Sequence, residues 1–242
     1  MCYEETPTVP PLDEIVLTSA DGSTFGAYAA RPANPSGARI VLLPDVGGLR
    51  PAVADLARRF TETGAAVIAV DYFGRTAGTG PRSDDFDNDP HVEVMQRANV
   101  LADARAALDY LGGDGPAYAL GFCLGGATAL VAATEDFGLA GAIAFCPYHG
   151  EMGQDPALPD DFVSGVRVPV LGLFGGDDKP VPPTVAAAFE KALEDAGKDY
   201  EIVVYPGQPH GFFEKDHFGE AGHEEAAADA FERVKAFLRR TA

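Results

Sequence analysis

One cysteine stands in a context that can make it a nucleophile. Cys123 lies in the run GFCLGG (residues 121–126), which follows the apolar segment 117–120 and precedes a run of small, helix-compatible residues. Glycines at this spacing allow a strand to turn sharply into a helix while holding the central side chain in a strained, exposed position. The start of a helix also favours the thiolate. The alternative is a structural cysteine buried in a glycine-rich turn.

A carboxylate and a histidine follow in the order that a catalytic triad requires. Asp177 and Asp178 come after the apolar segment 168–174, and His210 comes after the β-branched segment 201–205. In α/β-hydrolases the nucleophile, acid and histidine occur in that order, each just beyond a strand. His210 would take the thiol proton and later protonate the leaving alcohol, while an aspartate would orient and stabilise its cation. Asp178 and Asp177 both remain candidates for that acid.

The other cysteines and histidines are interpreted as structural or surface residues. Cys2 and Cys146 are widely spaced and form no CxxC motif, so neither a disulfide framework nor a zinc knuckle is predicted. Cys146 is expected to be packed at the end of a strand, and His149 just beyond it is expected near the pocket. A further acidic and histidine-containing stretch matches no standard metal-ligand spacing and is expected to be a solvated loop and helix start: Glu214, Asp216, His217, Glu220, His223 and Glu224. No metal and no cofactor are predicted.

Short apolar runs alternate with longer amphipathic stretches, which is typical of a doubly wound α/β fold with a mainly parallel sheet. An opening antiparallel hairpin is expected at 15–18 and 24–30, around the Asp21-Gly22 turn. Later strands are expected at 39–43, 66–70, 117–120, 140–145, 168–174 and 201–205. Helices are expected at 52–63, 91–111, 124–134, 183–196 and 224–239. The loops 72–90 and 147–165 are long enough to be lids, binding loops or simply solvated surface.

Composition limits the class of protein. The 242 residues, 46% of them apolar, fit a single α/β domain spanning 1–242. No segment has the roughly 20 apolar residues of a membrane span, and the polar start lacks the features of a signal peptide, so a soluble cytoplasmic protein is expected. The net charge of −19 disfavours nucleic acid and anionic membranes as partners.

Taken together, five motifs resemble the dienelactone hydrolase (carboxymethylenebutenolidase-like) family of α/β-hydrolases over residues 13–238. They are LPDVGGL (43–49), DYFGR (71–75), GFCLGG (121–126), GGDDKPVP (175–182) and YPGQPHGF (205–212). The resemblance implies an α/β-hydrolase fold without a large cap domain. It selects Asp178 over Asp177 as the acid and implies an oxyanion hole built from the backbone N–H groups of Leu124 and Val46.

The resemblance also implies how the thiol is controlled and where substrate binds. Family members that cleave dienelactones carry a glutamate where Asp45 stands, and this carboxylate gates the resting thiol; the alternative is that Asp45 only caps the following turn. They hold a substrate carboxylate with arginines, one of them at the position of Glu214, where a carboxylate would repel an anionic lactone. Arg75 and Arg82, in the long loop after Asp71, are the cations available instead; the alternative is that both are simply surface residues of that loop. The substrate-binding candidates are Arg75, Arg82, Phe212 and Glu214.

The predicted function is hydrolysis of a small ester or lactone through a thioester acyl-enzyme formed on Cys123. Two alternatives remain. One is an acyl or thioester hydrolase acting on a different leaving group. The other is a catalytically silent α/β-hydrolase-like binding protein, which the departures at Asp45 and Glu214 would favour.

Overall fold

The computed structural model describes residues 10–151, 153–155, 157–158, 161–214 and 222–242. Its strands are β1 (Leu12–Thr18), β2 (Thr24–Ala30), β3 (Arg39–Leu43), β4 (Ala66–Val70), β5 (Ala117–Phe122), β6 (Leu139–Phe145), β7 (Val170–Gly175) and β8 (Tyr200–Tyr205). Its helices are α1 (Pro51–Thr61), α2 (Gly74–Ala77), α3 (Asp89–Val92), α4 (Arg97–Leu111), α5 (Leu124–Ala132), α6 (Pro183–Asp195) and α7 (His223–Thr241), with a 3₁₀ turn, η1, at Phe162–Gly165.

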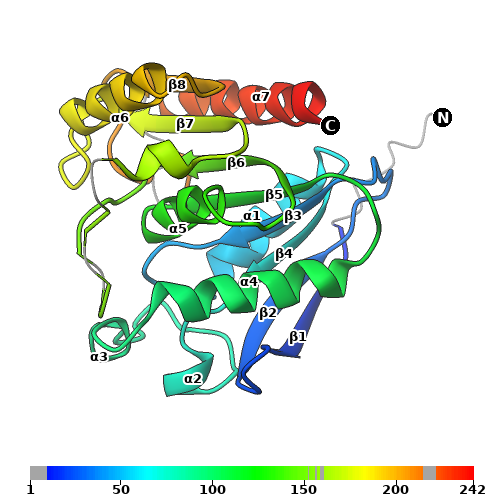
Figure 1. The fold of residues 1–242 in the computed structure, drawn as a ribbon. Coiled ribbons are helices and arrows are strands. Elements are labelled where there is room, and N and C mark those ends of the chain that lie inside the picture. Colours follow the sequence, from blue (N-terminus) through cyan, green and yellow to red (C-terminus); the bar gives the residue numbers. More distant parts are fainter. Residues whose placement is uncertain (1–9, 152, 156, 159–160, 215–221) are drawn as a thin grey trace.

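The eight strands form one sheet in the order β1-β2-β4-β3-β5-β6-β7-β8 (Figure 1). The opening hairpin pairs antiparallel, and β2 also pairs antiparallel with β4. All pairings from β4 to β8 are parallel. The predicted hairpin and mainly parallel sheet are therefore confirmed. Because the carboxyl ends of parallel strands share one edge, the segments that follow β5, β6 and β7 lie next to one another.

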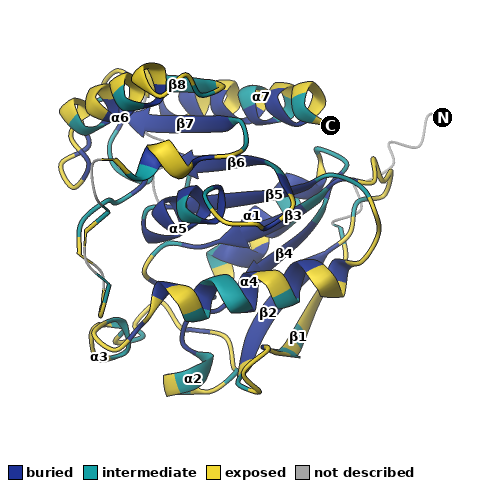
Figure 2. Ribbon diagram, viewed as in Figure 1, coloured by how far each residue is buried: buried dark blue, intermediate teal, exposed yellow. Residues whose placement is uncertain are grey.

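Helices cover both faces of the sheet, with α4 and α5 in front of it and α1 and α7 behind it in Figure 1. The core on the side of α1 and α7 contains Phe60, Phe231 and Phe237, and the core on the other side contains residues of α4 and α5. Central strands are buried on both sides, whereas the outer surfaces of the helices are exposed (Figure 2). This double burial explains why the central strands are continuous apolar runs.

The helix predicted at 91–111 is interrupted in the structure. Gln96 has an extended backbone (φ −125°, ψ 127°), so α3 ends before it and α4 begins at Arg97. The break is held by the distant loop after β6: the Gln154 N–H donates to the Met95 carbonyl at 3.0 Å, and the Arg97 N–H donates to the Asp155 carboxylate. No proline or glycine marks the break. No helix of the described segments is long and apolar enough to cross a membrane.

Candidate active site

Cys123 occupies a sharp strand-to-helix turn. It lies between β5 and α5 with φ 50° and ψ −113°, a conformation that a non-glycine residue seldom adopts. The turn is possible because its glycines carry no side chain. A Cβ atom on Gly121 would lie 2.1 Å from the Gly125 carbonyl oxygen, and one on Gly125 would lie 2.1 Å from the Leu43 carbonyl oxygen. The strained elbow expected from the motif is present, and it leaves Cys123 half-buried.

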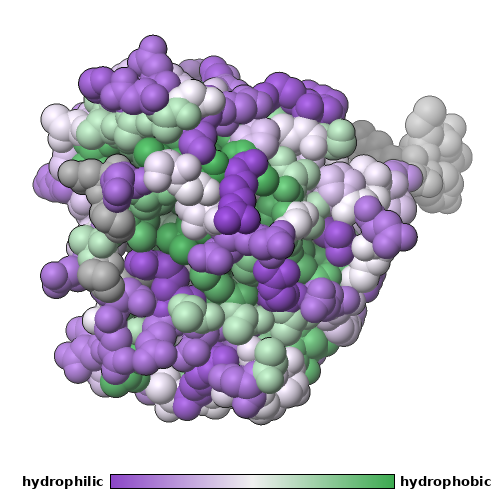
Figure 3. Space-filling view, in the orientation of Figure 1, coloured by the Kyte–Doolittle hydropathy of each residue, from purple (hydrophilic) through white to green (hydrophobic). Residues whose placement is uncertain are grey.

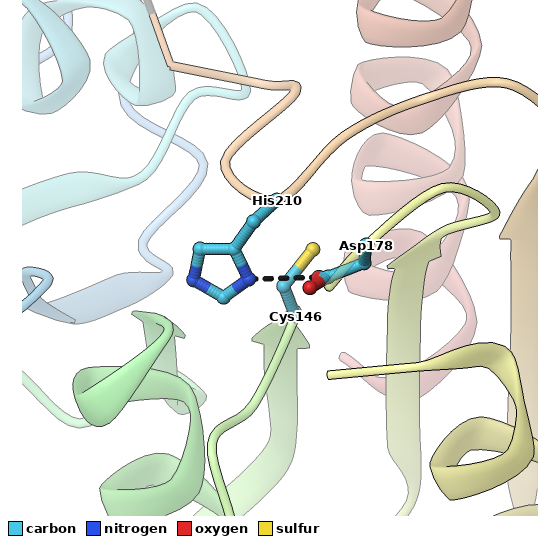
Figure 4. Close-up of side chains that lie close together, drawn as sticks. All are labelled: Cys146, Asp178 and His210. Atoms are coloured by element: carbon cyan, nitrogen blue, oxygen red, sulfur yellow. Dashed lines mark hydrogen bonds and ion pairs between the residues drawn. The ribbon is translucent and has the colours of Figure 1, made fainter. Parts of the chain in front are cut away.

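Asp178 and His210 form a hydrogen-bonded pair. His210 Nδ1 lies 2.7 Å from Asp178 Oδ2, and the Val181 N–H donates to Asp178 Oδ1 at 2.7 Å (Figure 4). The carboxylate of Asp178 is fully buried, whereas the His210 side chain is 25% exposed. Asp177 is exposed on the same turn. The structure thus brings Asp178, and not Asp177, to the histidine.

A cleft of about 420 Å³ lies beside Cys123. Cys123 and His210 both line it, with the oxyanion candidates Leu124 and Val46. Its remaining walls are apolar or acidic: Asp45, Val92, Tyr148, Glu151, Gly153, Pro180 and Glu214. No lysine or arginine of the described chain lines this cleft. Three carboxylates, of which Asp45 is paired with Arg50, therefore give the cleft an acidic lining.

The environment of the thiol disfavours its charged form. Burial raises the pKa of Cys123 to about 12, and the negative charges of Asp45, Glu214 and Asp178 act in the same direction. The Leu124 N–H at the start of α5 acts in the opposite direction. Because burial is the largest cause, the helix terminus does not produce a resting thiolate. The start of the helix does favour the thiolate, as expected, but the effect of burial on the pKa of Cys123 is larger.

Asp45 contacts its own turn and an arginine that the sequence analysis did not single out. Asp45 Oδ1 accepts from the Gly47 N–H at 2.9 Å, and Asp45 Oδ2 accepts from Arg50 Nη2 at 2.6 Å. The Arg50 side chain lies across Gly47, where a Cβ atom would be 2.2 Å from Nε. Asp45 therefore caps the turn that carries Val46, and it also lines the cleft close enough to influence the thiol.

The assignment of Arg75 and Arg82 to substrate binding is not supported. Both guanidinium groups are held by carboxylates of the fold: Arg75 by Asp103, and Arg82 by the buried Asp71 at 2.6 Å. Arg82 is only 5% exposed. Neither arginine lines the cleft. An exposed loop position had suggested a free cation, but the loop folds back so that both arginines neutralise buried acids.

Phe212 is a core residue and not part of the cleft wall. It is fully buried, with its ring 4.9 Å from that of Tyr205, centroid to centroid.

Of the other residues singled out in the sequence, His149 lines a separate groove beside α6, and burial lowers its pKa to about 4. His223 is buried at the start of α7. Asp216, His217 and Glu220, like Cys2, lie outside the described residues.

The sequence analysis did not assign Tyr148, Glu151 or Cys146 to the site. Tyr148 and Glu151 belong to the long loop after β6, which had been expected to be either functional or simply solvated, and both line the cleft. Cys146 is buried, as expected, but its sulfur lies directly beside Asp178 and His210 (Figure 4). Its position after β6, next to the strand that precedes Cys123, was the available signal.

Comparison with known proteins identifies the family. The model of the "Dienelactone hydrolase family" matches residues 25–242. A Saccharolobus solfataricus protein provisionally named carboxymethylenebutenolidase is 28% identical, over 95% of this chain and 99% of its own. A Bradyrhizobium protein provisionally named 2-oxo-3-(5-oxofuran-2-ylidene)propanoate lactonase is 28% identical over 90% of each chain. A crystal structure from Klebsiella pneumoniae, provisionally named a dienelactone hydrolase, superposes with a TM-score of 0.78 at 28% identity, covering 95% of this chain and 98% of that one.

These relatives confirm the predicted α/β-hydrolase fold and the resemblance found in the motifs. The matched region contains the elbow, the Asp178–His210 pair and every residue that lines the cleft. The chain belongs to the dienelactone hydrolase family and is a hydrolase of the carboxylic ester and lactone class.

Proposed function

We propose that the protein hydrolyses small esters or lactones with Cys123 as nucleophile, His210 as general base and acid, and Asp178 as the residue that orients His210. The observation that carries this proposal is the shared cleft: the strained Cys123 lines it together with His210, whose far nitrogen is bonded to a buried carboxylate. A nucleophile, a base and a group that orients the base are the three parts that acyl transfer requires.

The reaction begins from a neutral thiol, because burial and nearby carboxylates raise the pKa of Cys123. His210 Nε2 accepts the thiol proton as the sulfur attacks the substrate carbonyl carbon. The negative charge that develops on the carbonyl oxygen is accepted by the backbone N–H groups of Leu124 and Val46. Collapse expels the alcohol, which takes the proton from His210, and leaves a thioester. Water then attacks the thioester with His210 as base, releasing the acid and restoring the thiol.

The charges of the cleft favour neutral substrates over anionic ones. Asp45, Glu151 and Glu214 all line it, and a substrate carboxylate brought among them would meet like charges. Neutral lactones and short uncharged esters meet no such repulsion, and the apolar side chains of Val92 and Pro180 suit their hydrocarbon parts. The proposed substrate class is therefore an uncharged ester or lactone that fits a cleft of about 420 Å³.

Acylation of Cys123 is the decisive measurement. After brief mixing with p-nitrophenyl acetate and acid quenching, mass spectrometry should find one acetyl group on the peptide that contains Cys123. Cys123→Ala should lose this acetyl group and lower kcat/KM by about three orders of magnitude or more. Cys2→Ala, which removes a thiol outside the elbow, should keep both.

Two results would contradict the proposal. Turnover of Cys123→Ala at the wild-type rate would exclude the thioester mechanism. Absence of turnover and acylation in the wild type, across neutral esters, thioesters and lactones of graded size, would favour the silent binding protein.

A further inference from the structure

Cys146 is the second strained cysteine of the chain. It follows β6 directly, and its backbone N–H donates to the Leu173 carbonyl at 2.8 Å, one step beyond the regular end of the strand. Its φ of 43° lies in the left-handed region. Among the described residues, only Cys123 and Cys146 combine a side chain with a positive φ. The two cysteines therefore occupy equivalent positions at the ends of the neighbouring strands β5 and β6.

The conformation of Cys146 would suit glycine better. Glycine adopts a positive φ without the steric cost that a Cβ atom brings, and the described chain uses it at thirteen such positions. Strain at a non-glycine residue persists when the surrounding structure holds it, and it is concentrated at functional sites. Cys146 thus carries a side chain at a position where glycine would have less backbone strain.

The thiol of Cys146 lies at the junction of the segments that carry the acid and the base. Its sulfur, a carboxylate oxygen of Asp178 and a ring nitrogen of His210 all lie within 4.8 Å of one another (Figure 4). The backbone N–H groups of Gly211, next to His210, and of Gly175, at the end of β7, also act on this sulfur, in the direction that lowers its pKa. One side chain therefore lies beside both segments.

The protonation state of this thiol determines which role it can take. Burial raises the pKa of Cys146, and the negative charge of Asp178 raises it further. The group is only 2% exposed. It is therefore a neutral S–H, which can donate a hydrogen bond but is unsuited to act as a nucleophile.

We propose that Cys146 is a positioning residue for Asp178: its S–H donates to the carboxylate and fixes the orientation in which that carboxylate receives the His210 ring. The inference rests on the proposed triad. Asp178 Oδ1 is already held by the Val181 N–H, and the thiol lies beside the carboxylate from the direction of β6. Three segments, after β6, after β7 and after β8, are then connected through one carboxylate.

The expected effects follow from the loss of one donor. Without the thiol, the negative charge of Asp178 is less dispersed and stabilises the protonated ring of His210 more strongly. The pH at which kcat/KM falls to half its maximum on the acidic side should therefore move upward in Cys146→Ala. kcat should fall by about two- to tenfold, the usual range for one net hydrogen bond, with little change in KM. Cys146→Ser keeps a hydrogen-bond donor, so its kcat and its pH profile should both lie close to those of the wild type.

A double-mutant cycle tests whether Cys146 acts through Asp178. We expect Cys146→Ala to lower kcat in the wild-type background but to have no further effect in Asp178→Asn, because the carboxylate on which it acts is gone. Val170→Ala is the matched control: Val170 is fully buried on β7 but lies at the strand end remote from the site. It should lower thermal stability without changing the pH profile.

Two results would overturn the proposal. One is an unchanged kcat and pH profile in Cys146→Ala. The other is an equal loss of kcat in both backgrounds, because a merely structural effect does not depend on Asp178. Failure of the triad itself would be separate and recognisable: Asp178→Asn alone would then retain wild-type kcat.

Discussion

Asp45 has the features that both alternatives of the sequence analysis, capping of the turn and control of the thiol, would require. It caps the turn through the Gly47 N–H, and its charge is the largest electrostatic contribution that raises the pKa of Cys123 after burial. Arg50 contacts the same carboxylate at 2.6 Å and partly offsets that charge. Capping and control of the thiol can therefore be separated experimentally, because an asparagine keeps the acceptor oxygen and loses the charge.

We predict that Asp45→Asn lowers the pKa of Cys123 and speeds its alkylation by iodoacetamide near neutral pH by about two- to tenfold, since one pKa unit corresponds to a tenfold change. The sign follows because the pKa of Cys123 is raised to about 12. Removing a nearby negative charge lowers this pKa and so increases the thiolate fraction at every pH below 12. Arg50→Gln should slow alkylation. Asp177→Asn removes an exposed carboxylate and serves as the control. Identical alkylation profiles in Asp45→Asn and wild type would leave Asp45 with the capping role alone.

The choice between the two neighbouring aspartates is a second test at this scale. Asp178→Asn should lower kcat by about three to four orders of magnitude, because an amide cannot stabilise the protonated His210 and favours the wrong tautomer. Asp177→Asn should stay within about twofold of the wild type, since its side chain is exposed and Asp178 holds the ring. Steady-state kinetics on a neutral p-nitrophenyl ester decide the matter. The reverse pattern would identify Asp177 as the acid.

At the scale of elements, buried ion pairs attach the long segment after β4 to the body of the protein. Arg82 donates to both carboxylate oxygens of Asp71, at 3.2 and 2.6 Å, and it also donates to the carbonyls of Ala77 and Gly78. Asp71 in turn accepts from the Phe73 N–H at 3.1 Å. One guanidinium therefore connects the end of β4, the short helix α2 and the loop beyond it.

Replacing Arg82 by methionine should lower the free energy of unfolding by about 3 kcal/mol, because it leaves the Asp71 carboxylate buried and unpaired. Urea unfolding followed by circular dichroism measures the change. Arg58→Met is the matched control, since the Arg58–Asp55 pair lies on the surface and should contribute less than about 1 kcal/mol. If Arg82→Met has the stability of the wild type but a higher KM for carboxylated lactones only, the structural role of Arg82 is refuted. Arg82 would then be a substrate-binding residue.

At the scale of the whole molecule, the negative charge of the cleft agrees with that of the chain. The net charge is −19, and hydrophilic residues cover much of the face seen in Figure 3, with hydrophobic residues visible between them. An anionic substrate would therefore meet repulsion both on approach and within the cleft. Neutral substrates meet neither.

We predict that Glu214→Arg raises kcat/KM for a carboxylated lactone by about tenfold or more relative to a neutral lactone, since it replaces a like charge in the cleft by an opposite one. Glu190→Arg makes the same change of net charge on the exposed surface of α6 and isolates the local effect from the global one. Added salt should help the wild type with the anionic substrate only, because screening weakens repulsion. A wild-type preference for the carboxylated lactone would contradict the electrostatic argument.

The sequence by itself determined the parts of this protein that depend on local chemistry and chain order. The glycines around Cys123 predict the elbow because only glycine permits those backbone approaches, and the alternating apolar runs predict the parallel sheet. The order of Cys123, Asp178 and His210, each after a strand, predicts that they meet at one edge, since parallel strands end there. In the structure Asp178 is hydrogen-bonded to His210, and Cys123 lines the same cleft as His210.

Only the tertiary structure decided the features that depend on distant segments. The break before α4 is held by Gln154 and Asp155, more than fifty residues further along the chain, so no local pattern marks it. Arg82 looked like a free loop cation until folding placed it over the buried Asp71. Cys146 was expected to be only a packed residue at the end of a strand, and its proximity to Asp178 and His210, which follow β7 and β8, is set by the fold. Burial, charge pairing and hydrogen bonding are set by which chain segments become neighbours, and that is information a local pattern does not contain.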